Sequence, residues 1–263
     1  MSGVAIVTGA ARGIGAATVA ALAAEGWRVV AVDRGADDPR LPYALGSAAE
    51  LDAAVAAANA AAEERVRGEL ADVTDPARMA DVVACAEEWG GVEAIVANAG
   101  VIAGGAPAWE LSQAEEDAVV EVCLRGVMVA ARVGIPALLR RPEPRAGRFV
   151  ATASAASFRG LPGLAAYCAA KAGVSGFVRA LGADLRGTGV TAAAVAPGST
   201  DTPILAESAR LYALDSAAAF APQQPIERLI DPTEIAATIA WLCGPGGAAV
   251  TGTTVSVDGG LSI

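Results

Sequence analysis

The sequence predicts an α/β fold: a parallel, doubly wound sheet with helices on both faces. Short apolar runs typical of β-strands alternate with longer, alanine-rich segments typical of helices. That order favours parallel strands joined by crossover helices. Polar or glycine-rich residues directly follow most of the apolar runs. Ligands of such sheets bind at the carboxyl ends of the strands, so we expect these residues to meet at one edge.

Length and composition narrow the classes of protein to which the chain can belong. Its 263 residues suffice for one large domain, 1–263, and no repeat or linker divides it. A net charge of −10 without a basic run argues against binding to nucleic acid or to an anionic membrane surface. No apolar run is long enough to span a bilayer, and no signal peptide precedes the first strand, so a cytoplasmic protein is expected.

The chain has four scattered cysteines and no histidine. The cysteines form no Cys-x-x-Cys pair, which favours reduced thiols in the core. Without histidine, Ser-His-Asp catalysis, Cys-His catalysis and histidine-ligated metals are excluded, and no metal site is predicted. Proton chemistry would depend on Tyr, Lys, Asp, Glu or a cofactor.

The first predicted strand, residues 4–8, leads into the turn Gly9-Ala-Ala-Arg12-Gly13-Ile14-Gly15 and then a helix to about residue 25. Glycines let the backbone approach a pyrophosphate closely, and the N–H groups at a helix N-terminus favour its charge. In this strand–turn–helix setting the motif predicts a dinucleotide-binding turn.

The second strand, residues 27–33, ends at Asp33. An acid at this point normally bonds the adenosine ribose hydroxyls and repels a 2′-phosphate, which favours NAD over NADP. Arg12 and Arg34 oppose that choice because either could meet a phosphate. We expect Asp33 to determine the cofactor preference, in favour of NAD, since its position at the strand end is better defined than those of the arginines.

Residues 34–65 exceed the usual short connection and predict an insertion beside the adenosine end of the cofactor. Residues 37–42 indicate an irregular loop, and residues 48–65 indicate an alanine-rich helix. The alternative is a solvated loop without a function.

The remaining chain continues the alternation of strands and helices. The third strand is predicted to end within residues 69–73, and further strands are predicted at 92–97, 148–152, 190–195 and 254–257. Helices are predicted at 75–89, at 112–140 and from residue 232 onward. Residues 203–228 are expected to form an irregular apolar stretch that contacts the substrate. Asp72, Asn98, Ser154 and Pro197 fall at strand ends and should therefore lie at the ligand-binding edge.

Tyr167 and Lys171 are four residues apart in a predicted helix and should share one helix face. A lysine ammonium beside a tyrosine favours the phenolate and lowers its pKa, which suits a general acid/base. Of the 19 basic residues, Lys171 is the only lysine. Arginine cannot replace lysine where a compact charge is needed, so this position is a strong functional candidate.

These motifs, in this order, resemble the short-chain dehydrogenase/reductase family over essentially the whole chain, which implies a Rossmann-type fold and an NAD(P)-dependent alcohol or carbonyl oxidoreductase. The resemblance implies that Tyr167 is the acid/base, that Ser154 holds the substrate oxygen and that Lys171 binds the nicotinamide ribose and lowers the tyrosine pKa. Thr202 would bond the carboxamide. The predicted cofactor contacts are Gly9, Arg12, Gly13, Ile14, Gly15, Asp33, Arg34, Asp72, Val73, Asn98, Ala99, Gly100, Tyr167, Lys171, Pro197, Gly198, Thr200 and Thr202.

One position departs from the family pattern. Cys123 stands where the family usually has an asparagine that supports a proton relay through water to the lysine. A thiol is a poor substitute as a hydrogen-bonding group. A water or a neighbour would replace the asparagine, or turnover would be impaired, and Cys123 itself is expected to pack in the core.

Residues 27–34, 37–43 and 141–145 are similar to the mycofactocin-coupled branch of the family. This narrower resemblance implies a tightly held NAD that is covered by the insertion and re-oxidised in place by a peptide-derived redox carrier. Family habit also implies a homotetramer.

Three functions remain open. The leading one is an NAD-dependent dehydrogenase of an apolar secondary alcohol or its ketone, which the apolar stretch 203–228 favours. The second is an NADPH-dependent 3-oxoacyl-thioester reductase, favoured by Arg12 and opposed by Asp33. The third is a nucleotide-sensing binding protein without turnover, which Cys123 favours and the intact Ser154, Tyr167 and Lys171 oppose.

Overall fold

A computed structural model describes residues 3–263 and contains one parallel sheet of seven strands among them. The strands are β1 Val4–Thr8, β2 Arg28–Asp33, β3 Val66–Leu70, β4 Val92–Ala97, β5 Arg148–Thr152, β6 Thr191–Pro197 and β7 Thr253–Val257. Their order is β3-β2-β1-β4-β5-β6-β7, and every neighbouring pair is parallel. The order reverses between β1 and β4, which is the point where ligands bind in doubly wound sheets. The predicted fold class is confirmed.

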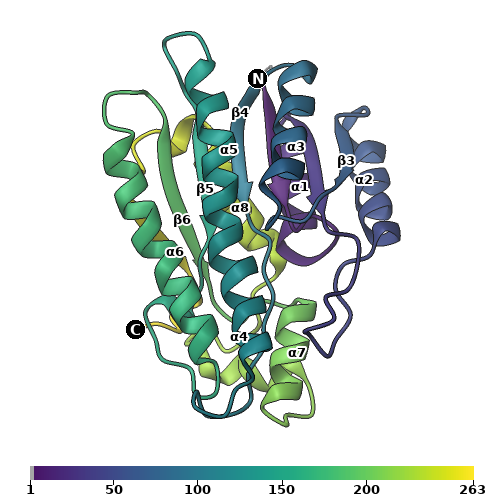
Figure 1. Ribbon diagram of the computed structural model, residues 1–263, viewed down its shortest axis with the longest axis vertical. Coiled ribbons are helices and arrows are strands. Elements are labelled where there is room, and N and C mark those ends of the chain that lie inside the picture. The colour runs from purple at the N-terminus through teal and green to yellow at the C-terminus, as the bar shows by residue number, and fades with distance from the viewer. Residues whose placement is uncertain (1–2) are drawn as a thin grey trace.

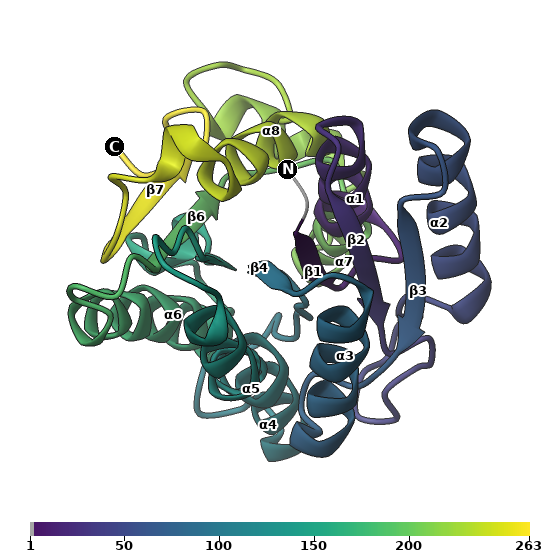
Figure 2. The ribbon, with the colours of Figure 1, turned by 90° about the horizontal axis from the view of Figure 1, so that it is seen from above.

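Helices cover both faces of the sheet, as the view from above shows (Figures 1 and 2). The helices are α1 Gly13–Ala24, α2 Ala48–Ala62, α3 Pro76–Trp89, α4 Gln113–Val120, α5 Gly126–Arg140, α6 Ala165–Asp184, α7 Pro203–Leu211 and α8 Pro232–Cys243. One core layer lies under α3, α5 and α6, and the other lies under α1, α2 and α8. Along β1, Val4 and Ile6 belong to the first layer, while Ala5 and Val7 belong to the second. Successive side chains of a strand face opposite sides of the sheet, and both sides are buried. The buried strands are therefore apolar at every position.

Capping residues set several helix ends where the sequence predicted them. The Asp75 side chain accepts hydrogen bonds from the backbone N–H groups of Ala77 and Arg78, and Pro76 follows at the first position of α3. Asp231 and Glu234 form a capping box at the start of α8.

The long helix predicted over residues 112–140 is interrupted by one π-helical turn, Glu121–Arg125, between α4 and α5. The whole stretch Gln113–Arg140 has the length and hydropathy to cross a bilayer. In this fold, however, 56% of its most apolar window is buried inside the protein. That burial is typical of a core helix.

The expectation of an irregular stretch over 203–228 is wrong in its first part. Residues Pro203–Leu211 form α7, and Ala217–Gln223 form a short 3-10 helix. Thr202 caps α7 by accepting a hydrogen bond from Leu205 N at 3.3 Å, and Pro203 suits the first helical turn. Thr202 and Pro203 are therefore a helix-start signal that is visible in the sequence. The prediction instead followed the apolar residues around them.

Candidate active site

A cavity of about 570 Å³ lies at the carboxyl ends of the strands, where sequence reasoning placed the ligand. Every predicted site residue except Gly15 lines it. The cavity runs from Asp33 and Asp72 at one end, past the glycine turn, to Ser154 and Tyr167. The motifs from seven separate stretches of the chain therefore converge on one site.

The turn after β1 depends on its glycines. Gly9 and Gly13 have φ angles of +69° and +58°, which side chains rarely adopt. A Cβ atom on Gly15 would lie 1.9 Å from the carbonyl oxygen of Gly9. Gly15 therefore allows α1 to begin directly against the turn, although it does not line the cavity. Within residues 3–263 no side chain caps α1, so its first N–H groups suit a pyrophosphate.

Asp33 ends β2 with its carboxylate at the cavity wall. Its Oδ2 accepts a hydrogen bond from Ala11 N at 3.0 Å, and its Oδ1 accepts one from Gly35 N at 3.3 Å. Gly46 lies against it, since a Cβ there would be 3.1 Å from Oδ1. The carboxylate is thus fixed beside the glycine turn, as the ribose of a dinucleotide requires.

The two arginines that could favour NADP both have partners in the insertion. Arg12 donates to the carbonyl oxygen of Ala44 at 2.8 Å and lies 3.8 Å from the Glu50 carboxylate. Arg34 pairs with Asp38 at 2.9 Å and with Asp72 at 3.4 Å. Neither guanidinium is left as an unpaired cation for a 2′-phosphate.

Residues 34–46, here called the 34–46 loop, are held to the rest of the protein at two points. Asp38 is 2% exposed, and the Arg40 guanidinium bridges it to Glu121 of the π turn, with distances of 2.8 and 2.7 Å. The hydrogen bonds from Arg40 hold the pKa of Asp38 well below its usual range. Further along, the oxygen of Tyr43 accepts a hydrogen bond from Ile102 N at 2.9 Å. Arg34, Tyr43, Leu45 and Gly46 line the cavity, so the 34–46 loop forms part of its wall.

A chain of hydrogen bonds joins the strand ends to the lysine. Asn98 N and Ala99 N both donate to Thr8 Oγ1, at 3.0 and 3.1 Å. Thr152 Oγ1 donates to Asn98 Oδ1 at 3.1 Å, and the carbonyl oxygen of Thr152 accepts from Lys171 Nζ at 2.7 Å. Asn98 and Thr152 thus fix the relative positions of β1, β4, β5 and α6. Sequence reasoning missed Thr152, although it is the last residue of its strand.

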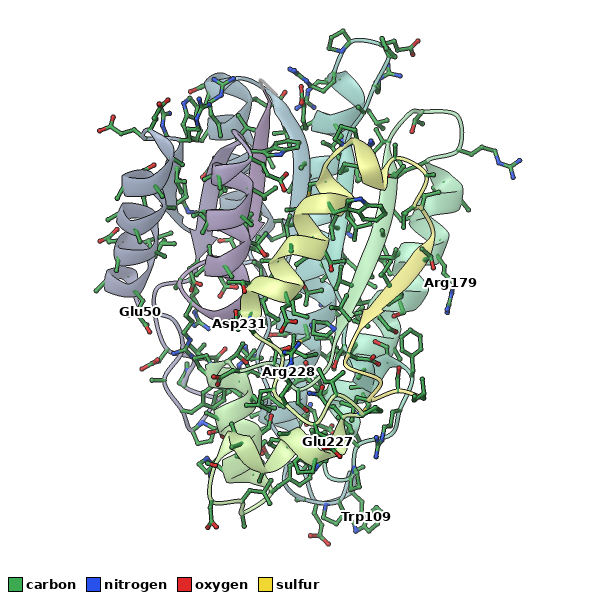
Figure 3. The ribbon with its side chains drawn as sticks, turned by 180° about the vertical axis from the view of Figure 1, so that it is seen from behind. Glu50, Trp109, Arg179, Glu227, Arg228 and Asp231 are labelled. Carbon is green, nitrogen blue, oxygen red and sulfur yellow. The ribbon has the colours of Figure 1, made fainter. Side chains whose placement is uncertain are left out.

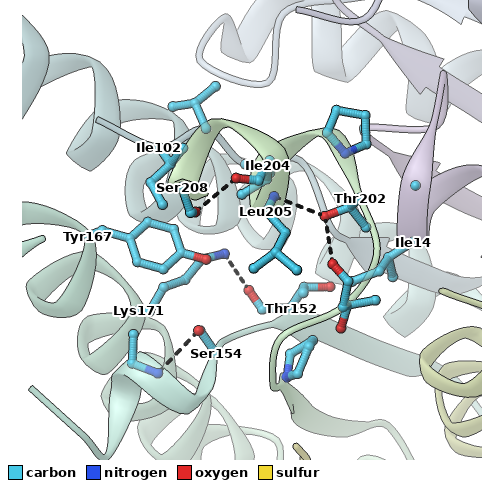
Figure 4. Close-up of a pocket in the computed structure, with 18 of the residues that line it drawn as sticks. Ile14, Ile102, Thr152, Ser154, Tyr167, Lys171, Thr202, Ile204, Leu205 and Ser208 are labelled. Atoms are coloured by element: carbon cyan, nitrogen blue, oxygen red, sulfur yellow. Dashed lines mark hydrogen bonds between the residues drawn. The ribbon is translucent and has the colours of Figure 1, made fainter. Parts of the chain in front are cut away.

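Ser154, Tyr167 and Lys171 point into the same part of the cavity (Figure 4). Ser154 Oγ accepts a hydrogen bond from Ala156 N at 3.1 Å, which fixes its rotamer. Lys171 Nζ lies 5.7 Å from the centre of the Tyr167 ring. The one-face geometry expected from the four-residue spacing is present.

Burial shifts the pKa values of both α6 side chains. Lys171 is 3% exposed, and burial lowers its pKa. Burial also raises the pKa of Tyr167, and the hydrogen bond with Ser154 offsets that only in part. The sequence predicted a lowered tyrosine pKa, so the direction has to be corrected. The loss of solvation outweighs any help from Lys171, which is itself desolvated and bonded to Thr152.

Cys123 lies in the π turn and is fully buried. Its Sγ donates to the carbonyl oxygen of Val101 at 3.1 Å and lies 3.3 Å from Val101 N. The thiol therefore joins the π turn to the segment that follows Asn98-Ala99-Gly100. A Cβ on Gly100 would lie 3.6 Å from Lys171 Nζ and 3.7 Å from Cys123 Sγ, so Gly100 is a close neighbour of both side chains.

Apolar side chains dominate the end of the cavity beyond Ser154 and Tyr167. They come from three parts of the chain and include Ile102, Leu164, Ile204, Leu205, Leu214 and Phe220. Tyr212 donates to the carbonyl oxygen of Pro162 at 2.6 Å and meets the Phe220 ring edge-on at 6.0 Å. Such a surface suits an apolar substrate. Tyr43, Ile102 and Leu261 were missed because nothing local in the sequence marks them.

The chain is similar to known dehydrogenases and reductases over nearly its whole length. A family model described as enoyl-(acyl carrier protein) reductase matches residues 9–262. Cis-4-hydroxycyclohexanecarboxylate dehydrogenase from Sinomonas cyclohexanicum is 37% identical over 262 residues, which are 98% of this chain and 96% of the relative.

Two solved structures show the same fold with different dinucleotides. Carveol dehydrogenase from Mycobacterium avium in complex with NAD has a TM-score of 0.91 at 28% identity, covering 98% of this chain and 97% of that chain. A variant of actinorhodin polyketide ketoreductase with NADPH has a TM-score of 0.88 at 35% identity, covering 99% and 97%. Overall likeness therefore does not select the cofactor.

Proposed function

Because the chain belongs to the short-chain dehydrogenase/reductase family, and so to its oxidoreductases, we propose that it uses NAD to interconvert an apolar secondary alcohol and its ketone. The observation that carries this proposal is the convergence of Ser154, Tyr167 and Lys171 on the cavity that also holds the glycine turn and Asp33. Solved structures with NAD and with NADPH share this fold, so the proposal of NAD is based on Asp33.

Different residues of the cavity would bind different parts of the cofactor. The N-terminus of α1 would hold the pyrophosphate, and Asp33 would accept hydrogen bonds from the adenosine ribose. Lys171 would hold the nicotinamide ribose, and Thr202 the carboxamide. The cofactor, when bound, accepts the hydride in oxidation and returns it in reduction.

The proton is handled by the protein. Ser154 and Tyr167 hold the substrate oxygen, and ionised Tyr167 takes the hydroxyl proton of the alcohol as its C–H bond breaks. The pair of electrons left by the proton forms the carbonyl. In reduction, Tyr167 donates the proton while Ser154 stabilises the growing charge on oxygen. Thr152 keeps Lys171 in place, and the positive charge of oxidised NAD, when bound, would favour the phenolate form.

The proposed reaction is tested by supplying secondary alcohols and an artificial electron acceptor to the purified, NAD-loaded protein and following reduction of the acceptor. Cyclic and terpenoid alcohols should be oxidised, while small polar sugars should not. Turnover of the sugars alone would contradict the proposal. Binding of NAD without turnover of any alcohol or ketone would favour the sensing protein instead.

We expect replacement of Asp33 by alanine to raise the Kd for NAD by about 10- to 100-fold, since hydrogen bonds to a charged group contribute roughly 1.5–3 kcal/mol. NADP should gain little, because Arg12 and Arg34 remain paired. Asp52→Ala, which removes a charge from the exposed side of α2, is the matched control. If wild type already prefers NADPH and reduces 3-oxoacyl thioesters, the alternative favoured by Arg12 is correct.

We further propose that the 34–46 loop retains NAD and that a mycofactocin-type redox carrier re-oxidises it in place. NAD should then co-purify with the protein and survive dialysis. Asp38→Asn removes the charge that holds Arg34 and Arg40, so NAD release should quicken by at least about tenfold. Asp81→Asn, in an exposed ion pair with Arg78, is the control. A protein that emerges empty and exchanges NAD freely would contradict retention.

A homotetramer in the cytoplasm is proposed as the working form. β7 is an edge strand of the sheet, and Trp241 on α8 is 49% exposed, so both could be covered by another copy. All four cysteines are free thiols, as a reducing compartment permits. Light scattering that gives a monomer mass would overturn the assembly.

A further inference from the structure

We propose that Arg159 binds a carboxylate of the substrate, so that the substrates are secondary alcohols or ketones with an acid group on an apolar frame. The inference rests on the proposed function and narrows its substrate class. Arg159 lies in the loop between β5 and α6, five residues after Ser154 and eight before Tyr167, and it lines the same cavity.

The charges along the cavity single out this residue. Among the described residues, four cations line it, namely Arg12, Arg34, Arg159 and Lys171. Arg12 and Arg34 face acids of the adenosine end, and Lys171 is bonded to Thr152. Arg159 alone among these arginines has no carboxylate partner within the part of the chain that the structure describes, residues 3–263.

The backbone holds Arg159 without using up its hydrogen bonds. Its NH1 donates to the carbonyl oxygen of Leu261 at 3.0 Å. This bond fixes the side chain against the C-terminal segment, which also lines the cavity. The remaining N–H groups of the guanidinium can still form the two parallel bonds that a carboxylate accepts.

The surroundings make an anionic group the fitting partner. The acids that line the cavity, Asp33 and Asp72, are at the adenosine end, and none in the range 3–263 lines the substrate end. The whole chain carries a net charge of −10, which repels anions from the surface. Arg159 is exposed and has no carboxylate partner among residues 3–263, so its charge would offset that repulsion locally. The apolar residues Leu161, Pro162 and Leu261 line the same cavity, so an apolar frame suits the substrate.

The test compares 4-hydroxycyclohexanecarboxylate with its neutral methyl ester, using the NAD-loaded enzyme. Wild type should prefer the acid in kcat/KM by roughly 10- to 100-fold, mainly through KM, because a charged hydrogen-bonded pair is lost with the ester. Arg159→Gln should abolish this preference and leave the ester unchanged, while Arg159→Lys should restore part of it. Arg179→Gln removes a charge on α6 that projects into solvent (Figure 3) and should change nothing.

Binding gives a second readout that needs no turnover. Cyclohexanecarboxylate lacks the reacting hydroxyl, and calorimetry should show that Arg159→Gln weakens its binding by the same factor. If cyclohexanecarboxylate binds in this way but no alcohol is oxidised, the carboxylate site at Arg159 is supported and the proposed function is contradicted. If acid and ester react alike, or if Arg159→Gln lowers both equally, Arg159 only anchors Leu261 and the inference is overturned.

Discussion

Replacement of Tyr167 by phenylalanine is expected to lower kcat for alcohol oxidation by about 10²- to 10⁴-fold, the usual contribution of a general acid/base. The ring and its packing remain, so NAD affinity and the unfolding temperature should hardly change. Steady-state rates, together with NAD titration, check both halves of this expectation. A variant that keeps wild-type turnover would remove Tyr167 from the mechanism, and equal losses of affinity and rate would point to a binding role.

The same variant isolates the ionisation of Tyr167 in the free protein. Burial raises its pKa, so the phenol should ionise above the ordinary value of about 10. Absorbance titration of wild type minus Tyr167→Phe removes the signals of Tyr43 and Tyr212. Oxidised NAD brings positive charge beside the phenol, so adding it should lower the pKa and shift alcohol oxidation toward neutral pH. A tyrosine that ionises below about 10 without NAD would contradict the burial argument.

Replacement of Gly15 by alanine is expected to remove cofactor binding almost completely. The new Cβ would lie 1.9 Å from the oxygen of Gly9 and 2.8 Å from Asn98 Nδ2. Relief requires the turn to move away from α1, at a stability cost of roughly 1–3 kcal/mol for the added group. Because the turn would hold the pyrophosphate in the proposed function, the Kd for NAD should rise by at least about 100-fold, the loss of two charge-assisted hydrogen bonds.

Gly176→Ala provides the matched comparison. Gly176 lies within α6, and a Cβ there would meet only the end of Arg179 at 3.8 Å. Alanine is the better helix former, so this variant should bind NAD normally and unfold at the same or a higher temperature. Normal NAD binding by Gly15→Ala would show that the close approach of α1 to Gly9 is not required.

Sequence reasoning succeeded where the signal is local. Strand ends follow apolar runs, so the order of residues alone is enough to place Asp33, Asn98 and Ser154 at one edge of the sheet. The four-residue spacing placed Tyr167 and Lys171 on one face for the same reason. All these features depend on residues close together in the chain.

What sequence reasoning missed depends on distant partners. The 34–46 loop reaches the active site through Tyr43, whose hydrogen-bond partner Ile102 is 59 residues away. The π turn around Cys123 became visible only with its contacts to Val101. The sign of the Tyr167 pKa shift depends on how many neighbours exclude water, which spacing along a helix does not report.

The single lysine of the chain has one more consequence. Lys171 is the only ε-amino group and is 3% exposed. Reagents that acylate amines therefore have, besides an α-amino group, one target, and it lies inside the cofactor cavity. The extent of labelling at this site would report how often the cavity opens, and labelling elsewhere would not obscure it. Because it is the only lysine, Lys171 can thus serve as a probe of how accessible the cavity is.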